Sequence, residues 1–321
     1  MIWIHYYARL LAAATLLLVA AGGMVTSTQS GLAVPDWPTT YGENMFTFPY
    51  SQMVGGIFYE HGHRLIASFV GMLTIGLVLL LWWRERRRWV RRLGVIALAT
   101  VILQGLLGGL TVLYFLPDPI SISHAGLAQI FFCLTIAIAL FTSRTWETPP
   151  QPPVDDPRLA RRLIWMTGLV YLQVILGATM RHTGAGLAIP DFPLVYGGLL
   201  PPAWTPAIAL HYAHRVGALV VTALVLTNAA YIWSRHGDRR ELVRPSWVLI
   251  AAVALQIALG AMVVLTGKQP VINTLHVAGG AGVLATSVVL LLRAFRARFG
   301  AAPAAQRDRY AARHLRSAEG T

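Results

Sequence analysis

The sequence predicts an all-α integral membrane protein with eight transmembrane helices, arranged as two four-helix bundles related by a pseudo-twofold axis. The 321 residues are 56% hydrophobic and only 12% charged, which is too few charges for an ordinary soluble protein. The chain also contains eight apolar runs of roughly the 20 residues that a helix needs to cross a bilayer. Landmarks of the first half recur in the second half, which predicts two bundles of like structure.

The eight apolar runs are the predicted membrane spans. The first run follows Arg9 and ends in small residues, as a signal peptide does. Because the fifth run repeats this segment from within the chain, we interpret the first run as a membrane span. The spans are residues 10–26, 62–83, 93–116, 120–142, 163–181, 208–233, 246–266 and 271–292.

The basic residues orient these spans. An even number of crossings places both termini on one side of the membrane, and loops rich in Arg and Lys face the cytoplasm. We therefore expect cytoplasmic termini and a location in the plasma (inner) membrane. The opposite, outer loops hold few basic residues beyond Arg181 and Lys268. The clusters are Arg84, Arg86, Arg87, Arg88, Arg91 and Arg92, then Arg158, Arg161 and Arg162, then Arg235, Arg239, Arg240 and Arg244, and the tail from Arg293.

Charge and cysteine content exclude two kinds of function. The net charge is +13, but the basic clusters are short and separated by long apolar runs, unlike the continuous patch of a nucleic-acid-binding protein. The single cysteine, Cys133, lies inside an apolar run, so neither an intrachain disulfide nor a cysteine metal cluster can form. Metal or cofactor chemistry must therefore use histidine.

A proline-rich, acidic segment, TPPQPPVDDP, divides the chain between the fourth and fifth spans. This composition is typical of a solvated linker. The predicted units are an N-terminal bundle (1–147), a cytoplasmic linker (148–162), a C-terminal bundle (163–298) and a cytoplasmic tail (299–321).

Two outer loops carry the internal repeat. SGLAVPDWPTTYG (Ser30 to Gly42) follows the first span, and AGLAIPDFPLVYG (Ala185 to Gly197) follows the fifth. In the spans, His214 follows His63 by 151 residues and His276 follows His124 by 152, as Gln256 follows Gln104. Each half has an even number of spans, so the halves share one orientation and the pseudo-twofold axis runs along the membrane normal.

His63, His124, His214 and His276 are the candidate ligands. Ionisable side chains inside spans are costly and mark functional sites. All four lie near the outer ends of even-numbered spans, and two inward-facing imidazoles on different helices of one bundle can hold a haem iron from both sides. Interhelical hydrogen bonds are the plainer reading of any single histidine, but four in repeat register favour two haem pockets. A zinc site lacks a clear third ligand in either half, although Glu60 is a candidate in the first.

Each half has polar residues beside its first ligand, and these differ. Arg64 and Arg215 directly follow His63 and His214; their guanidinium groups suit haem propionates or lipid phosphate at the interface. Glu60 and His211 stand three residues before the ligands, on the same helix face. A carboxylate there can move protons or stabilise positive charge at a reacting centre, or it can simply pair with Arg64.

The sequence closely resembles the haem A synthase family along almost its whole length. The resemblance is carried by GGMVTSTQSGLAVPDWP (Gly22 to Pro38), EHGHR (Glu60 to Arg64), QGLLGGLTV (Gln104 to Val112), His124, AGLAIPDFP (Ala185 to Pro193), HYAHR (His211 to Arg215), QIALGAMVV (Gln256 to Val264) and His276. It implies an integral membrane oxidoreductase that converts haem O to haem A by oxidising a porphyrin methyl group, through an alcohol stage, to a formyl group.

The resemblance also implies the role of each site residue. His63 and His124 match the ligands of the substrate haem, and Glu60 matches the catalytic carboxylate. His214 and His276 match the ligands of a resident haem B that passes electrons. Implied partners are haem O itself, haem O synthase, cytochrome oxidase assembly proteins, an electron donor that the sequence does not identify, and further copies of the chain in a homo-oligomer.

The chain departs from the family in two places, and rival functions remain. Many members carry a cysteine pair in an outer loop, and these loops contain none, so no thiol chemistry is available there. Thr26 stands where a basic residue is common, whereas the second half has Arg181. The four histidines alone would also suit a dihaem b-type electron carrier or a haem exporter or chaperone; Glu60 and the long outer loops favour the enzyme.

Overall fold

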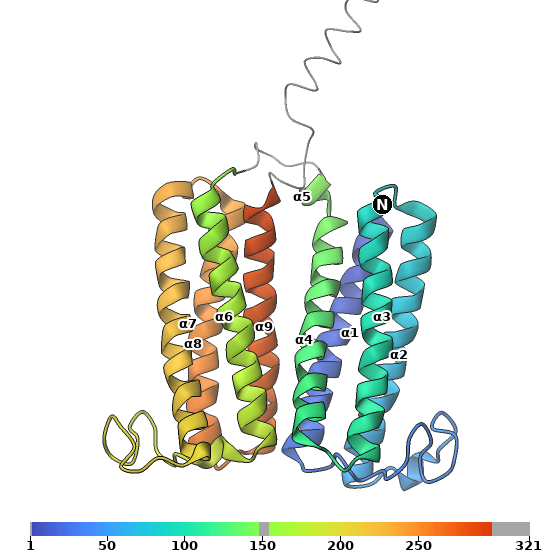
Figure 1. The fold of residues 1–321 in the computed structure, drawn as a ribbon. Coiled ribbons are helices and arrows are strands. Elements are labelled where there is room, and N and C mark those ends of the chain that lie inside the picture. The colour runs from blue at the N-terminus through green and yellow to red at the C-terminus, as the bar shows by residue number, and fades with distance from the viewer. Residues whose placement is uncertain (1, 148–153, 297–321) are drawn as a thin grey trace, which may run out of the picture.

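The computed structural model describes residues 2–147 and 154–296, and eight long helices in this part of the chain confirm the predicted membrane architecture. Figure 1 shows them as two neighbouring bundles, with the long loops at one end of the molecule. The helices are α1 (Ile2–Ser27), α2 (Gly56–Arg84), α3 (Arg88–Leu113), α4 (Asp118–Phe141), a short α5 (Arg144–Glu147), α6 (Pro157–His182), α7 (Pro206–His236), α8 (Arg240–Leu265) and α9 (Pro270–Ala294). Two 3-10 turns, Tyr50–Gln52 and Ala185–Leu187, lie in the loops.

The helices are longer than the apolar runs because their polar ends continue beyond the hydrocarbon thickness. The first helix begins at Ile2, and α6 begins at Pro157, inside the segment that the sequence analysis assigned to the linker. Asp156 caps α6 by accepting from the main-chain N–H groups of Arg158 and Leu159, a common helix start. Residues 148–153 of the linker and the tail 299–321 lie outside the described residues.

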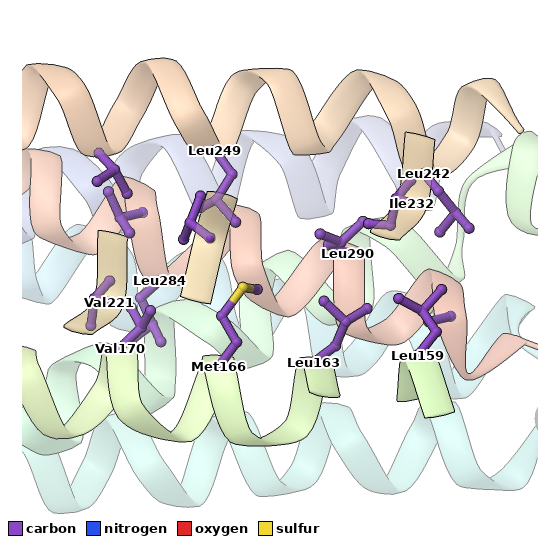
Figure 2. Close-up of a cluster of buried hydrophobic side chains, with 14 residues drawn as sticks. Leu159, Leu163, Met166, Val170, Val221, Ile232, Leu242, Leu249, Leu284 and Leu290 are labelled. Atoms are coloured by element: carbon purple, nitrogen blue, oxygen red, sulfur yellow. The ribbon is translucent and has the colours of Figure 1, made fainter. Parts of the chain in front are cut away.

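Each bundle has its own apolar core. In the second half, Leu159, Leu163, Met166 and Val170 recur every three or four residues along α6, which places them on one helix face. They pack against buried side chains of α7, α8 and α9, as Figure 2 shows. Large apolar side chains on the opposite faces point outward, such as Leu79, Leu172 and Leu219, as expected for helices that contact lipid.

The two bundles meet along α1 and α4 of the first half and α6 and α9 of the second. Phe132 of α4 packs against the small residues Ala281 and Ala285 of α9, which allow close helix approach. The α1–α9 contact of one side is matched by the α4–α6 contact of the other. This arrangement is compatible with the predicted pseudo-twofold relation.

The long loops lie at one end of the bundles, which we call the loop end; the opposite end is the basic end. Corresponding residues fold the two loops in the same way. Tyr41 and Tyr196 both take a positive φ, and their hydroxyl groups each donate to a carbonyl eight residues earlier, that of Ala33 or Ala188, at 2.5 Å. The repeat seen in the sequence is therefore a repeat of loop structure.

Candidate functional site

The four candidate histidines lie at matching depth below the loop end. They are residues seven to nine of their helices, roughly 10–13 Å along each axis at 1.5 Å per residue. Their burial is provided by the helix that precedes each in the chain, because a glycine there leaves room for the ring. A Cβ added at any of these glycines would lie 3.0–3.2 Å from the imidazole Cε1. The pairs are Gly22 and His63, Gly108 and His124, Gly177 and His214, and Gly260 and His276.

The two histidines of each half are close together. The ring centroids of His214 and His276 are 6.4 Å apart, with an angle of 74° between the ring planes. Metal–imidazole bonds are about 2 Å long, and a ring centroid lies roughly 1 Å beyond its nitrogen, so one ion between two rings needs centroids roughly 6 Å apart. His63 and His124 are near enough to interact electrostatically. The structure thus places the rings of the second pair at this separation and the first pair within range of an electrostatic interaction.

Three of the four histidines are each contacted by a glutamine of the neighbouring helix. Nε2 of Gln104 and of Gln256 donates to the main-chain oxygen of His124 and of His276, at 2.8 and 2.7 Å. Gln173 makes the same contact with His214 at 2.7 Å. The repeat of Gln104 and Gln256 was visible in the sequence, whereas the roles of Gln173 and of the glycines were not predicted. The signal was available, since each glutamine stands four residues before the glycine under the ring.

Glu60 and Arg64 connect α2 to the first long loop. Glu60 is 3% exposed; one carboxylate oxygen accepts from the main-chain N–H of Val34 at 2.8 Å, and the other accepts from Arg64 at 2.7 Å. Arg64 also donates to the carbonyl oxygens of Val34, Asp36 and Thr39. The pairing of Glu60 with Arg64, weighed above as an alternative, is therefore present, and the guanidinium binds loop carbonyls.

The second half repeats this arrangement with an imidazole. His211 accepts from the main-chain N–H of Ile189 through Nδ1, and Arg215 approaches its Nε2; both distances are 3.2 Å. Arg215 also donates to the carbonyl oxygens of Ile189, Asp191 and Leu194. These are the repeat equivalents of the carbonyls held by Arg64. The neutral imidazole serves as a hydrogen-bond acceptor where the first half has a charged one, so only the first half has a carboxylate at this place.

Each long loop also contains a carboxylate that holds its turn. Burial raises the pKa of Asp36, but hydrogen bonds from Thr39, Gly42 and Tyr41 outweigh it and hold that pKa below its usual value. In the second loop, the main-chain N–H of Gly197 is the main reason that the pKa of Asp191 is lowered. Both carboxylates are therefore charged at neutral pH and keep the turns closed.

Replacing Arg215 with alanine should loosen the second loop without unfolding the bundle. Three main-chain carbonyls lose a charged donor, and such hydrogen bonds contribute about 1.5–3 kcal/mol each. We expect main-chain amides of residues 189–198 to exchange with deuterium at least about tenfold faster, as measured by mass spectrometry. The control is Arg235→Ala, because Arg235 is exposed and lies at the basic end. Unchanged exchange in Arg215→Ala would show that the guanidinium does not hold the loop.

Two further histidines, His61 and His182, and Arg181 lie near the loop end. His61 is buried and bonds Thr40 of the first loop at 3.0 Å, so it faces this loop. Arg181 extends to α1, where it donates to the Gly23 carbonyl oxygen and to the Ser27 hydroxyl. This link between the halves was not predicted from the sequence. His182 ends α6 and interacts electrostatically with His124 and Asp118.

The donor set of the described residues favours two-ligand sites. Within residues 2–147 and 154–296, no three His, Cys, Asp or Glu side chains are grouped so as to hold a metal ion. The zinc alternative with Glu60 therefore has no support in this part of the chain, because protein zinc sites need at least three protein ligands.

Comparison with known proteins shows the family of this chain. The family model described as "COX15-CtaA: Cytochrome oxidase assembly protein" matches residues 5–288. A heme A synthase from Symbiobacterium thermophilum is 33% identical over 262 residues, which cover 78% of this chain and 82% of that protein. Heme A synthases from Shouchella clausii and Halalkalibacterium halodurans are 32% and 28% identical, over 78% and 81% of this chain and 83% and 87% of their own lengths. The chain therefore belongs to the COX15-CtaA family of cytochrome oxidase assembly proteins.

Proposed function

We propose that this protein is a haem A synthase, a membrane oxidoreductase that converts a methyl group of haem O to the formyl group of haem A through a hydroxymethyl intermediate. The relatives that carry the name heme A synthase support the reaction. The observation that carries the proposal is the difference between two otherwise matching sites: Glu60 is a buried carboxylate where His211 is an imidazole.

The residues present fit a haem in each bundle. The His214 and His276 rings are at the separation that one iron between them requires. The Nδ1 atoms of His63, His124 and His276 are buried without a hydrogen-bond partner. The glycines behind the four rings leave space for the imidazoles that a larger residue would fill. Buried imidazoles without partners are costly, and coordination of iron would offset that cost.

We assign the two bundles different roles. His63 and His124 hold the substrate haem in the first bundle, beside Glu60. His214 and His276 hold a resident haem B in the second, which supplies electron transfer when bound. Arg64 and Arg215 orient the loops that cover the pockets; with their Nη groups engaged by loop carbonyls, they act on a propionate at most through those loops.

Glu60 is the residue that acts during the oxidation. Oxidising a rim methyl develops positive charge or releases a proton beside the ring, and a carboxylate in a low-dielectric pocket stabilises that charge or accepts that proton. The loop N–H and Arg64 fix its orientation, so no reorganisation is needed at the reacting moment. His211 lacks the negative charge, which suits a haem that only transfers electrons.

The proposal includes a place and partners. The basic end faces the cytoplasm by the positive-inside rule, which puts both haem pockets toward the outer face of the plasma membrane. Haem O reaches the first pocket as substrate, and haem O synthase and cytochrome oxidase assembly proteins are the expected neighbours in the membrane.

The haem content of the purified protein tests this function. From membranes that contain haem O, we expect the protein to carry haem O or haem A together with haem B, as read by a pyridine haemochrome spectrum and chromatography of the extracted haems. A dihaem electron carrier would carry haem B alone, and that result would overturn the proposal. A haem exporter or chaperone would carry haem O without producing haem A.

A further inference from the structure

Three ligand-bearing turns are fastened to the neighbouring helix by a glutamine, and the fourth is not. The glutamine, four residues before the glycine under each ring, donates to the main-chain oxygen of the histidine itself. Residues four apart share a helix face, so the glycine and the glutamine contact one histidine together. The fastened histidines are His124 by Gln104, His214 by Gln173 and His276 by Gln256.

His63 is the exception. Leu18 stands four residues before Gly22, the glycine under the His63 ring, and a leucine side chain has no donor. The backbone of Leu18 lies near the His63 ring, but its side chain cannot donate to the main-chain oxygen of His63. The His63 turn is therefore positioned by packing on Gly22 and by the backbone of Leu18, without the glutamine contact of the other three histidines.

The two bundles also differ at the residue three positions after the first histidine of each, which is Ile66 in the first bundle and Gly217 in the second. In the second bundle, the amide of Gln173 lies against Gly217, where an added Cβ would be 2.1 Å from its Oε1 atom. Gly279, three residues after His276, makes the same room for Gln256. Beside Gln104 the corresponding residue is Leu127, so only the two glutamines of the second bundle lie against a glycine at this place. In the first bundle, Ile66 stands at the place of Gly217, three residues after His63, and Leu18 and Ile66 both pack against the apolar core.

We propose that Gln104, Gln173 and Gln256 are positioning residues that fasten three axial ligands, and that His63, unfastened by Leu18 and Ile66, is the ligand that releases the substrate haem. This inference rests on the proposed function, because it takes the four histidines as ligands. The resident haem has two fastened ligands. The substrate haem has one, His124, so it can enter and leave by displacement of His63 while His124 keeps its place.

The proposed reaction requires the two haems to be held with different stability. A substrate must be exchanged at each turnover, whereas a resident electron carrier must stay bound. Outer-shell partners of metal ligands change metal affinity by roughly 10–100-fold when removed, so one contact is enough to separate the two behaviours. The difference lies beside only one of four otherwise similar rings.

A reciprocal exchange of the two residue pairs tests the inference in the full-length protein. Gln173→Leu with Gly217→Ile gives the second bundle the first bundle's arrangement. We expect haem B to transfer to excess apomyoglobin roughly 10–100-fold faster, with part of its low-spin spectrum converted to high-spin. Unchanged transfer in a variant that retains its helix content and elution volume would overturn the proposal.

The opposite exchange, Leu18→Gln with Ile66→Gly, adds the missing contact. We expect the first-bundle haem to transfer to apomyoglobin about tenfold more slowly and haem A to stay with the enzyme after synthesis. Equal or faster transfer would contradict the proposal. If the Gln173→Leu, Gly217→Ile variant fails to fold, the Leu18→Gln, Ile66→Gly variant still tests the proposal, because Ile66→Gly makes room in the core for the new amide.

Two controls separate the possible failures. Gln129→Leu removes another buried amide, on α4, which makes no hydrogen bond to the four histidines in the described structure; it should leave both transfer rates unchanged. A loss of haem B on alanine substitution of His214, with unchanged transfer in the Gln173 pair variant, rejects only the fastening role. Retention of haem B in both His214→Ala and His276→Ala rejects the ligand assignment of the second bundle, on which the fastening role rests.

Discussion

Replacing Glu60 with glutamine is expected to leave haem bound in both bundles and to abolish most formyl formation. The amide keeps the shape of the carboxylate and one acceptor for the Val34 N–H, but it cannot stabilise a positive charge or take up a proton. General acid–base groups contribute roughly 10²–10⁴-fold to rates, so haem A formation should fall by about that factor. Chromatography of the extracted haems should show haem O or its alcohol accumulating.

The second bundle provides the matched control for this experiment. His211→Gln changes the residue that makes the same two contacts, to a loop N–H and to an arginine, and it should impair haem B retention or electron delivery without creating a second substrate site. Deuterium exchange at Val34 shows whether the first loop has stayed in place. Haem A production at the normal rate by Glu60→Gln would leave Glu60 only as the partner of Arg64.

Replacing His214 or His276 with alanine is expected to remove haem B while the helices remain. Each ring fills the space over a glycine and faces its partner at a centroid distance of 6.4 Å, so the loss of one ring removes half of the axial coordination. The effect should exceed the roughly 10–100-fold that the loss of an outer-shell partner costs. The low-spin haem B spectrum of the purified protein, scaled to protein content, is the measurement.

His236→Ala serves as the comparison for these variants. His236 lies at the basic end and bonds Asp156 at 2.9 Å, far along α7 from His214, and its removal should leave the haem spectrum intact. A full low-spin haem B spectrum in both His214→Ala and His276→Ala would show that the second bundle has been assigned wrongly.

Most of the architecture could be predicted from the sequence because it depends on local properties. Eight apolar runs of sufficient length specify eight helices, since a backbone in lipid must satisfy its own hydrogen bonds. The repeat of SGLAVPDWPTTYG as AGLAIPDFPLVYG predicts two loops of one structure, and the matching turns at Tyr41 and Tyr196 bear this out. Helix ends were less predictable, as at Pro157, because polar residues at a helix end lie outside the hydrocarbon.

The residues of the candidate site could likewise be predicted from the sequence, but their spatial arrangement could not. Spacing within one helix and along the repeat identified His63, His124, His214 and His276, since a histidine inside a span stands out against its apolar neighbours. That His214 and His276 lie at a centroid distance of 6.4 Å depends on how helices far apart in the chain pack, and no pattern within a single helix contains that information.

The sequence by itself thus determined the membrane class, the eight spans, the repeat and the identity of the four histidines. Only the tertiary structure decided what surrounds them: the glycine behind each ring, the glutamine that holds three of them, and the loop carbonyls that occupy Arg64 and Arg215. The physical reason is that hydrophobic length and periodicity act along one helix, whereas a hydrogen bond such as that from Gln173 to His214 requires two helices to meet at one depth and rotation.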